Sequence, residues 1–306
     1  MSGKYKLPNR SRLRAGYIFE EIERPRQDRE ETEEDTYWVS WQTPMMGAFN
    51  AKVKYSFADR DGTENDADNI TVLMDPFSSG SSLHPDGAAR YTLSDRKQNK
   101  YQFNATYGFS NTASIGTNIQ VWDDDYDAVV GLQQLKGQMF TVDLAFQPTR
   151  VLSVSTYTGM QRFTFDQRSS AGNVPWTQET EQTSWVTGVD VDWQAIPNKL
   201  VVNLGLRYTD STGDITQVDE TPGTVTELPD IETSIATLEL GAEYFLDKQT
   251  TLLFRAVYED YSEKNWAYDG FGTIQATNAT RSYLTGGLDS PNYQAGLIEF
   301  GVRHDF

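Results

Sequence analysis

The sequence contains no cysteine and only two histidines. The absence of cysteine excludes disulfides, a thiol nucleophile, a Cys-ligated zinc ion and the C-x-x-C-H motif that attaches c-type haem. Any haem that works with this protein must therefore be carried by a partner. Two histidines, His84 and His304, are too few for us to expect a histidine-based metal or catalytic site.

Basic residues and long apolar runs are also scarce. The chain has 26 Lys and Arg against 44 Asp and Glu, and a net charge of -18, which argues against nucleic-acid binding because phosphates require a basic surface. No stretch approaches the ~18 consecutive apolar residues of a membrane-spanning helix. The mean hydropathy of -0.58 would suit a soluble protein, but a transmembrane β-barrel also gives low values because only alternate residues face lipid.

What the sequence does contain is alternation of apolar and polar residues. Near its end, Ile298, Phe300, Val302, His304 and Phe306 share one face of an extended segment, as in the last strand of an outer-membrane barrel. From Leu13 onward about twelve such segments match the ~9–11 residues of a tilted spanning strand. The clearest lie at residues 49–57, 101–109, 200–208 and 236–244, whereas residues 37–42 and 151–158 alternate poorly and predict no register.

The connections between these segments alternate in length. Short turns with Pro, Asn, Gly or Asp are predicted at residues 43–47, 110–112, 147–150, 194–199 and 246–250. Long polar loops are predicted at residues 23–35, 58–98, 123–138, 166–181, 210–232 and 260–291. This alternation places all turns on one side of a membrane and all loops on the other. A soluble β-sandwich would not require it.

The sequence therefore predicts an all-β protein, an antiparallel up-and-down transmembrane β-barrel of about twelve strands or the matching part of a larger one. The short turns are expected in the periplasm and the long loops outside a bacterial outer membrane. Residues 1–10 are expected to form a periplasmic N-terminal tail and residues 11–306 one barrel domain. Trp185 and Trp193 share a face, and their separation of about 19 Å along the membrane normal suits the two rims of the apolar band.

Several short motifs add information through their order and spacing. They are FEEIER at residues 19–24 followed by Glu-rich residues 29–35 and TYW at 36–38, YSFADRDG at 55–62, DDDY at 123–126, YTDS at 208–211 with GDI at 213–215, LPDI at 228–231, and YEDY at 258–261 leading to Trp266. Together they resemble the C-terminal half of the MtrB/PioB family, the outer-membrane β-barrels that sheathe a multihaem cytochrome. The resemblance covers nearly the whole chain.

This resemblance implies a non-catalytic sheath that houses and positions a periplasmic multihaem c-type cytochrome for electron transfer across the outer membrane. The expected partners are membrane lipid, that cytochrome and an extracellular multihaem cytochrome, while the chain itself holds no cofactor. Family members are usually about twice as long, so twelve strands are expected to form part of a larger barrel; closed on themselves they would leave a narrow lumen. The alternative function is a passive porin whose inner charges select small solutes.

Two acidic clusters are candidate Ca²⁺ sites because hard cations bind carboxylates on flexible loops. The clusters are Asp123, Asp124, Asp125 and Asp127, and Asp59, Asp61, Glu64, Asp66 and Asp68. Neither follows the EF-hand spacing, so we predict no metal site and favour solvated or lipopolysaccharide-facing loops. Glu-rich residues 30–34 are interpreted as solvated rather than as a docking patch. Ser-rich residues 78–82 lack the Gly-Lys-Ser/Thr ending of a phosphate-binding loop.

Paired carboxylates on the predicted lumen face were considered for acid and base catalysis. The pairs are Glu239 with Glu243 and Asp190 with Asp192, and the same face carries Arg12, Arg14, Lys52, Lys54, Arg207, Arg255 and Arg303. A mixed-charge network that hydrates the lumen or holds a partner is the simpler interpretation, so we predict no enzyme activity and no catalytic residue. A Ser-His-acid site is disfavoured because His84 lies in a long loop and His304 on the lipid or rim face.

Overall fold

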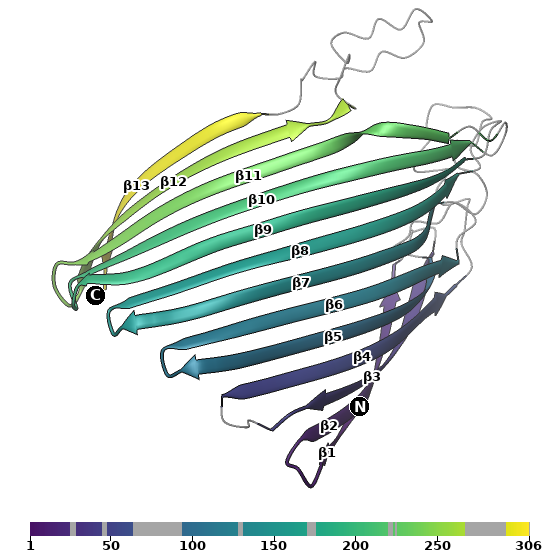
Figure 1. The fold of residues 1–306 in the computed structure, drawn as a ribbon, viewed down its shortest axis with the longest axis horizontal. Coiled ribbons are helices and arrows are strands. Elements are labelled where there is room, and N and C mark those ends of the chain that lie inside the picture. The colour runs from purple at the N-terminus through teal and green to yellow at the C-terminus, as the bar shows by residue number, and fades with distance from the viewer. Residues whose placement is uncertain are drawn as a thin grey trace, which may run out of the picture.

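The computed structural model describes residues 1–24, 29–44, 48–63, 94–127, 131–169, 176–219, 223, 225–266 and 292–305. In these residues the chain forms a single curved sheet of thirteen strands (Figure 1). The strands are β1 (Ser2–Lys6), β2 (Arg12–Glu23), β3 (Glu31–Gln42), β4 (Phe49–Gly62), β5 (Asp95–Ser110), β6 (Ala113–Asp127), β7 (Gly131–Thr149), β8 (Leu152–Ser169), β9 (Trp176–Ile196), β10 (Leu200–Asp219), β11 (Val225–Phe245), β12 (Thr250–Lys264) and β13 (Tyr293–His304).

The sheet has the simplest possible topology, because spatial order follows chain order and all neighbouring strands are antiparallel. The predicted up-and-down wall is therefore confirmed, and the twelve strands predicted from Leu13 onward correspond to β2–β13. A thirteenth strand, β1, lies within residues 1–10 and pairs Ser2 with Gly16 and Lys6 with Arg12. In the described residues β1 and β13 are the two edges of the sheet.

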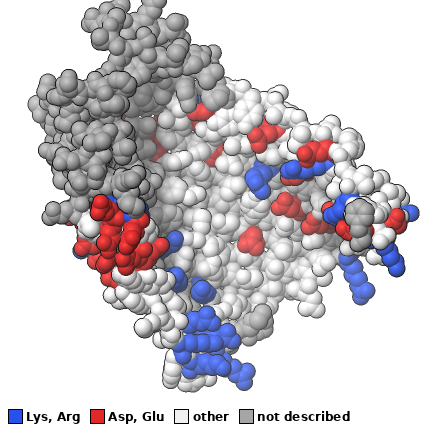
Figure 2. Space-filling view, turned by 180° about the vertical axis from the view of Figure 1, so that it is seen from behind, with Lys and Arg blue, Asp and Glu red and all other residues white. Residues whose placement is uncertain are grey.

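The strand registers divide the sheet into an apolar outer face and a polar inner face. Cross-strand pairing joins one outer row of Val154, Val191, Leu204, Leu240, Ala256 and Ile298. The adjacent inner row consists of Ser153, Asp192, Asn203, Gly241, Arg255 and Glu299. Charged side chains lie on the hollowed face in Figure 2, the face hidden in Figure 1. The period of two thus separates lipid-facing from lumen-facing residues.

The sheet is a single layer without the core of a soluble protein. Among the described residues, the buried hydrophobic ones are Ala51, Ala58, Tyr126 and Leu132. Large outer-face side chains are instead exposed, including Phe300 at 81%, Trp185 at 51% and Trp193 at 47%. Such exposure is tolerated only where lipid or another protein covers it. A search of the described residues finds no helix with the length and apolarity that a membrane crossing requires.

The strands are longer than predicted, so the predicted extents of several loops are wrong. β6 continues to Asp127 and β7 begins at Gly131, within the predicted loop 123–138. Likewise, β10 runs to Asp219 and β11 starts at Val225. At about 3.3 Å per residue and 45° tilt, a strand of 21 residues such as β9 rises about 49 Å, well beyond the ~25 Å apolar band. The apolar outer pattern ends with the hydrocarbon, but the backbone hydrogen-bond ladder continues into water.

Side-chain hydrogen bonds and backbone conformation shape the turns. In the β11–β12 turn, Asp247 Oδ1 accepts hydrogen bonds from the backbone N–H groups of Gln249 and Thr250, both at 2.8 Å. These hydrogen bonds lower the pKa of the Asp247 carboxyl group. In the β9–β10 turn, Asn198 has φ of 59°, a left-handed conformation that asparagine tolerates better than most residues. Both turns lie where the sequence predicts them.

Three aromatic rings lie over glycines of neighbouring strands on the inner face. A Cβ atom at Gly137 would lie 2.1 Å from the Trp122 ring, and one at Gly16 would lie 2.6 Å from the Trp38 ring. The third ring, that of Tyr157, lies over Gly188 in the same way. Each glycine leaves room for a ring that covers the backbone of the next strand. These contacts fix large side chains on a wall that has little other packing.

The assignment of faces predicts opposite effects for the same substitution on adjacent residues. Leu204→Arg places a charge near the middle of the lipid-facing band and is expected to cost about 2–4 kcal/mol of unfolding free energy. Asn203→Arg places the same charge in the lumen and is the matched control. Its expected change in unfolding free energy is below about 1 kcal/mol. Urea unfolding in lipid vesicles, followed by tryptophan fluorescence, measures both. Equal losses for the two variants would contradict the assignment.

The ring-over-glycine contacts are tested by adding one methyl group. Gly137→Ala forces the Trp122 ring out of its position and is expected to cost about 1–3 kcal/mol. Gly241→Ala is the control, because a Cβ atom there would lie 3.7 Å from Asn203, an ordinary contact. The same unfolding measurement applies. A control variant as unstable as Gly137→Ala would show that the ring contact does not determine the loss.

Candidate functional site

The inner face of the sheet is the candidate functional surface, and its charges form two regions. The first, which we call the basic patch, consists of Lys4, Lys6, Arg12, Arg14, Lys52, Lys54 and Lys100. The register places Lys4 opposite Arg14, Lys6 opposite Arg12, and Lys54 and Lys52 opposite Gln102 and Asn104. In Figure 2, Lys and Arg side chains gather over β1 and β2. This patch lies toward the turn side of the sheet.

The second region, the mixed-charge network, spans β9–β13. Arg255 Nε donates to Glu239 Oε1 at 2.6 Å, and Arg255 Nη1 lies 3.5 Å from Glu299 Oε2. Arg303 Nη2 lies 3.4 Å from Glu243 Oε2. The predicted mixed-charge network is therefore present in this half of the wall. These pairs are about half exposed, so each stabilises the fold by about 1 kcal/mol or less.

Three glycines open a hollow of 580 Å³ over this network. Gly205, Gly241 and Gly301 contribute no side chains, and the hollow is bordered by Asp190, Asp192, Asn203, Glu239, Arg255 and Glu299. The predicted lumen-facing pairs Glu239 with Glu243 and Asp190 with Asp192 thus lie on one wall. Asp192 accepts a hydrogen bond from Asn203, and Arg207 Nε donates to Tyr157 Oη at 2.9 Å. The arrangement provides a hydrated, charged surface.

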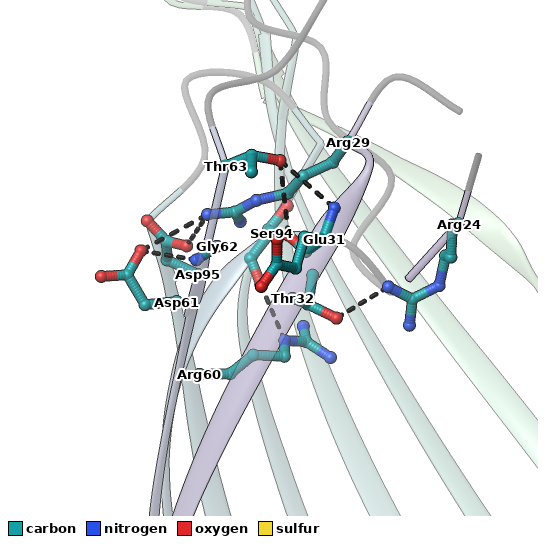
Figure 3. Close-up of polar contacts among 10 residues, drawn as sticks. All are labelled: Arg24, Arg29, Glu31, Thr32, Arg60, Asp61, Gly62, Thr63, Ser94 and Asp95. Carbon is teal, nitrogen blue, oxygen red and sulfur yellow. Dashed lines mark hydrogen bonds and ion pairs between the residues drawn. The ribbon is translucent and has the colours of Figure 1, made fainter. Parts of the chain in front are cut away.

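Ion pairs also join the loop-side ends of β2–β5 (Figure 3). Arg29, with a side chain only 5% exposed, has its Nη2 atom 2.6 Å from Asp95 Oδ1 and 3.4 Å from Asp61 Oδ1. Arg60 Nε donates to the Ser94 carbonyl oxygen at 2.9 Å, and Arg24 Nη1 donates to Thr32 Oγ1 at 2.7 Å. Each contact lies at the loop-side ends of the strands, where the backbone hydrogen bonds between strands stop. The cluster therefore fixes the loop-side rim.

Among the described residues, the carboxylates of the two acidic clusters considered above do not gather within ligand distance of one another. Asp123 and Asp125 accept hydrogen bonds from Gln134 Nε2, whereas Asp124 accepts one from Gln98 on the other face. Alternation therefore separates carboxylates that are adjacent in sequence. Glu64, Asp66, Asp68, the Ser-rich residues 78–82 and His84 lie outside the described residues.

One acidic group was not recognised from the sequence. Glu21, Glu31 and Glu33 have carboxylate oxygens within 4.8 Å of one another, on the outer face beyond the apolar band. Desolvation, followed by the neighbouring charges of Glu21, Glu33 and Glu23, raises the pKa of Glu31. The β2–β3 register brings these carboxylates together, because Glu21 pairs with Glu33 and Glu23 with Glu31. Like charges directly opposite one another destabilise a strand pair.

The structure also locates the residues considered for catalysis. His304 lies at the turn-side end of β13 on the outer-face parity, and its Nδ1 atom is 3.1 Å from Thr250 Oγ1. This histidine therefore lies on the opposite face of the sheet from the inner carboxylates Glu239 and Glu243. Lys4, Lys6 and Lys100 are inner-face residues that sequence reasoning missed. Of these, Lys100 was readable, because it shares the parity of Gln102 and Asn104 on the same strand.

Comparison with known proteins identifies the family of this chain. The model of a family described as "Putative outer membrane beta-barrel porin, MtrB/PioB" matches residues 1–306. The chain belongs to the MtrB/PioB family. Its predicted membership and its outer-membrane location are thereby confirmed.

A curated relative supports the same assignment. The chain is 26% identical over 308 aligned residues to the outer membrane protein MtrB of Shewanella baltica (strain OS185), covering 99% of the chain and 42% of that relative. The chain thus spans less than half the length of the curated relative that it matches.

Solved structures show the same fold in outer-membrane transport proteins. The ferric-catecholate import receptor Fiu from E. coli K12 has a TM-score of 0.65 at 11% identity, covering 99% of this chain and 53% of Fiu. The copper transporter OprC has a TM-score of 0.60 at 12% identity, with coverages of 97% and 42%. The ferric citrate transporter FecA has a TM-score of 0.58, also at 12% identity, with coverages of 96% and 42%. These likenesses support the barrel fold; the family is porin-like, and the neighbours are transporters and receptors.

The energetic role of the mixed-charge network is open to a direct test. Arg255→Gln removes the ion pairs to Glu239 and Glu299, and we expect a loss of about 1 kcal/mol or less because all three side chains are about half exposed. Urea unfolding in vesicles measures the difference from the native chain. A loss above about 3 kcal/mol would mean that this network is a structural centre of the wall.

Proposed function

We propose that this chain forms part of the wall of a wide outer-membrane barrel that encloses a periplasmic multihaem c-type cytochrome. The wall insulates the cytochrome from lipid while electrons pass through haems that the partner carries. The observation that carries this proposal is the division of the sheet into an apolar outer face and a polar inner face with two charged regions. Membership of the MtrB/PioB family and the likeness to MtrB support this assignment.

Barrel dimensions argue that more strands are needed. Thirteen strands, spaced about 4.8 Å apart and tilted about 40°, would close to a backbone diameter of about 26 Å. Inner side chains reduce the opening to about 16 Å, narrower than the ~30 Å of a small folded domain. A barrel of twice that circumference would have a backbone diameter of about 52 Å. That width admits a protein.

The edges of the sheet support the same conclusion. In the described residues, β1 and β13 each pair on one side only. Hydrocarbon offers no hydrogen-bonding partner for a free strand edge, so lipid-exposed open edges do not occur in spanning sheets. Each edge therefore needs a partner strand, and further strands would supply one. Several additional strands would also provide the wider lumen.

A passive porin is the second candidate function. The hollow beside Asp190, Glu239 and Arg255 gives the inner wall a hydrated, charged surface of the kind that selects small ions. The family description likewise includes the word porin. In this alternative the chain would conduct without any partner.

Electron transfer into vesicles tests the sheath directly. A barrel that includes this chain as part of its wall is folded into lipid vesicles that contain a reducible dye, a purified periplasmic multihaem c-type cytochrome is added, and an impermeant reductant is supplied outside. We expect dye reduction only when chain and cytochrome are both present. Vesicles with cytochrome alone, and vesicles with an unrelated porin plus cytochrome, are the controls.

Planar-bilayer conductance of the chain alone is the measurement that can contradict the sheath proposal. Discrete open-channel steps without cytochrome, together with no cytochrome-dependent dye reduction, would reject the sheath and favour the porin. Absence of channel steps with cytochrome-dependent reduction would support the sheath.

A further inference from the structure

The basic patch has uncompensated charge in a strongly acidic protein. The net charge of the chain is -18, yet the ion pairs of the described residues involve none of Lys4, Lys6, Arg12, Arg14, Lys52, Lys54 or Lys100. The inner-face positions between these residues are uncharged and comprise Ser40, Gln42, Ser56, Gln102 and Asn104. In contrast, the arginines of the mixed-charge network pair with glutamates.

Two lysines of the patch are positioned by the ring-over-glycine contacts. Lys54 Nζ lies 5.6 Å from the centroid of the Trp38 ring, and Lys100 Nζ lies 5.3 Å from that of Trp122. A cation over an aromatic face is stabilised without losing its charge. Since each ring is itself held over a glycine, both ammonium groups are presented at defined places on the inner face.

The size and place of the patch restrict its ligand. The patch extends from β1 to β5, about 19 Å at 4.8 Å per strand, which is wider than a single small anion and suits a protein surface. It lies on the hollowed inner face rather than against lipid. It also lies near the turns that join β1 to β2 and β3 to β4, so a protein entering from the turn side would meet it early.

We infer that the basic patch is the surface that receives an acidic, carboxylate-rich face of the protein in the lumen. This inference rests on the proposed sheath function and names the chemistry of the contact. Opposite charge accelerates encounter and fixes the orientation of the incoming protein around the barrel axis. The charges of the mixed-charge network are paired with one another and would attract an acidic occupant less than the basic patch does. The occupant would therefore be held against the side of the wall that carries the basic patch.

Charge reversal tests the patch with a control of equal net charge. Lys6→Glu with Lys52→Glu alters two exposed residues of the patch. Lys199→Glu with Lys248→Glu changes two exposed residues in the turns after β9 and β11, away from the patch. We measure association of an acidic multihaem c-type cytochrome with the native chain and both variants in vesicles, over a series of salt concentrations. Urea unfolding verifies that all three chains are folded.

At low ionic strength, we expect the patch variant to bind the cytochrome at least about tenfold more weakly, with a shallower salt dependence, and the control variant to bind as the native chain does. Equal affinities for all three chains would overturn the inference while leaving the sheath function intact. Salt-independent association of the native chain, a result that needs no variant, would also overturn it.

A second probe separates failure of the inference from failure of the proposed function. If no chain binds the cytochrome, the sheath proposal fails, and poly-glutamate is used in the same assay. Binding of poly-glutamate to the native chain and the control variant, lost in the patch variant, would still support recognition of an acidic polypeptide. Failure of poly-glutamate to bind, or its displacement by equimolar inorganic phosphate, would show that the patch does not recognise an acidic polypeptide surface.

Discussion

The requirement that every backbone N–H and C=O group inside a membrane be hydrogen-bonded within the protein dominates this structure. A sheet meets it only if the ladder is continuous from strand to strand, which here it is from β1 to β13. The ladder makes each strand antiparallel to the next, sets the registers and continues beyond the apolar band. Side chains add little packing of their own, since few described hydrophobic residues are buried.

The same ladder gives the wall its chemistry. Successive side chains of a strand point to opposite faces, so one register places Leu204 toward lipid and Asn203 toward the lumen. On the inner face, glycines either receive aromatic rings, as at Gly137, or leave a hollow, as at Gly241. The result is an uneven inner surface that distinguishes one side of the lumen from the other. Within the described part of the chain, the cations toward β1 form no ion pairs, whereas those toward β13 do.

Much of the fold could be predicted because the signal is local. Alternation of apolar and polar residues predicted β2–β13 and the inner position of Arg255 and Glu239, and turn chemistry predicted the turn at Asp247. The loop boundaries failed where polar strand residues, such as those of β10 beyond Asp210, looked like loop. Short β1 and the inner lysines Lys4 and Lys6 were missed because five residues next to a turn carry too weak a pattern.

The sequence by itself determined the fold class, the two faces and the absence of Cys-bound haem, because these depend on composition and on a period of two, while the order of its short motifs indicated the family. The tertiary structure alone decided which residues meet across strands. Trp122 with Gly137, Arg255 with Glu299 and Lys6 with Arg12 are partners because of register, and register is a property of strand pairs. It also decided that the acidic run at Asp123, Asp124 and Asp125 divides between two faces, since adjacent residues of a strand point in opposite directions.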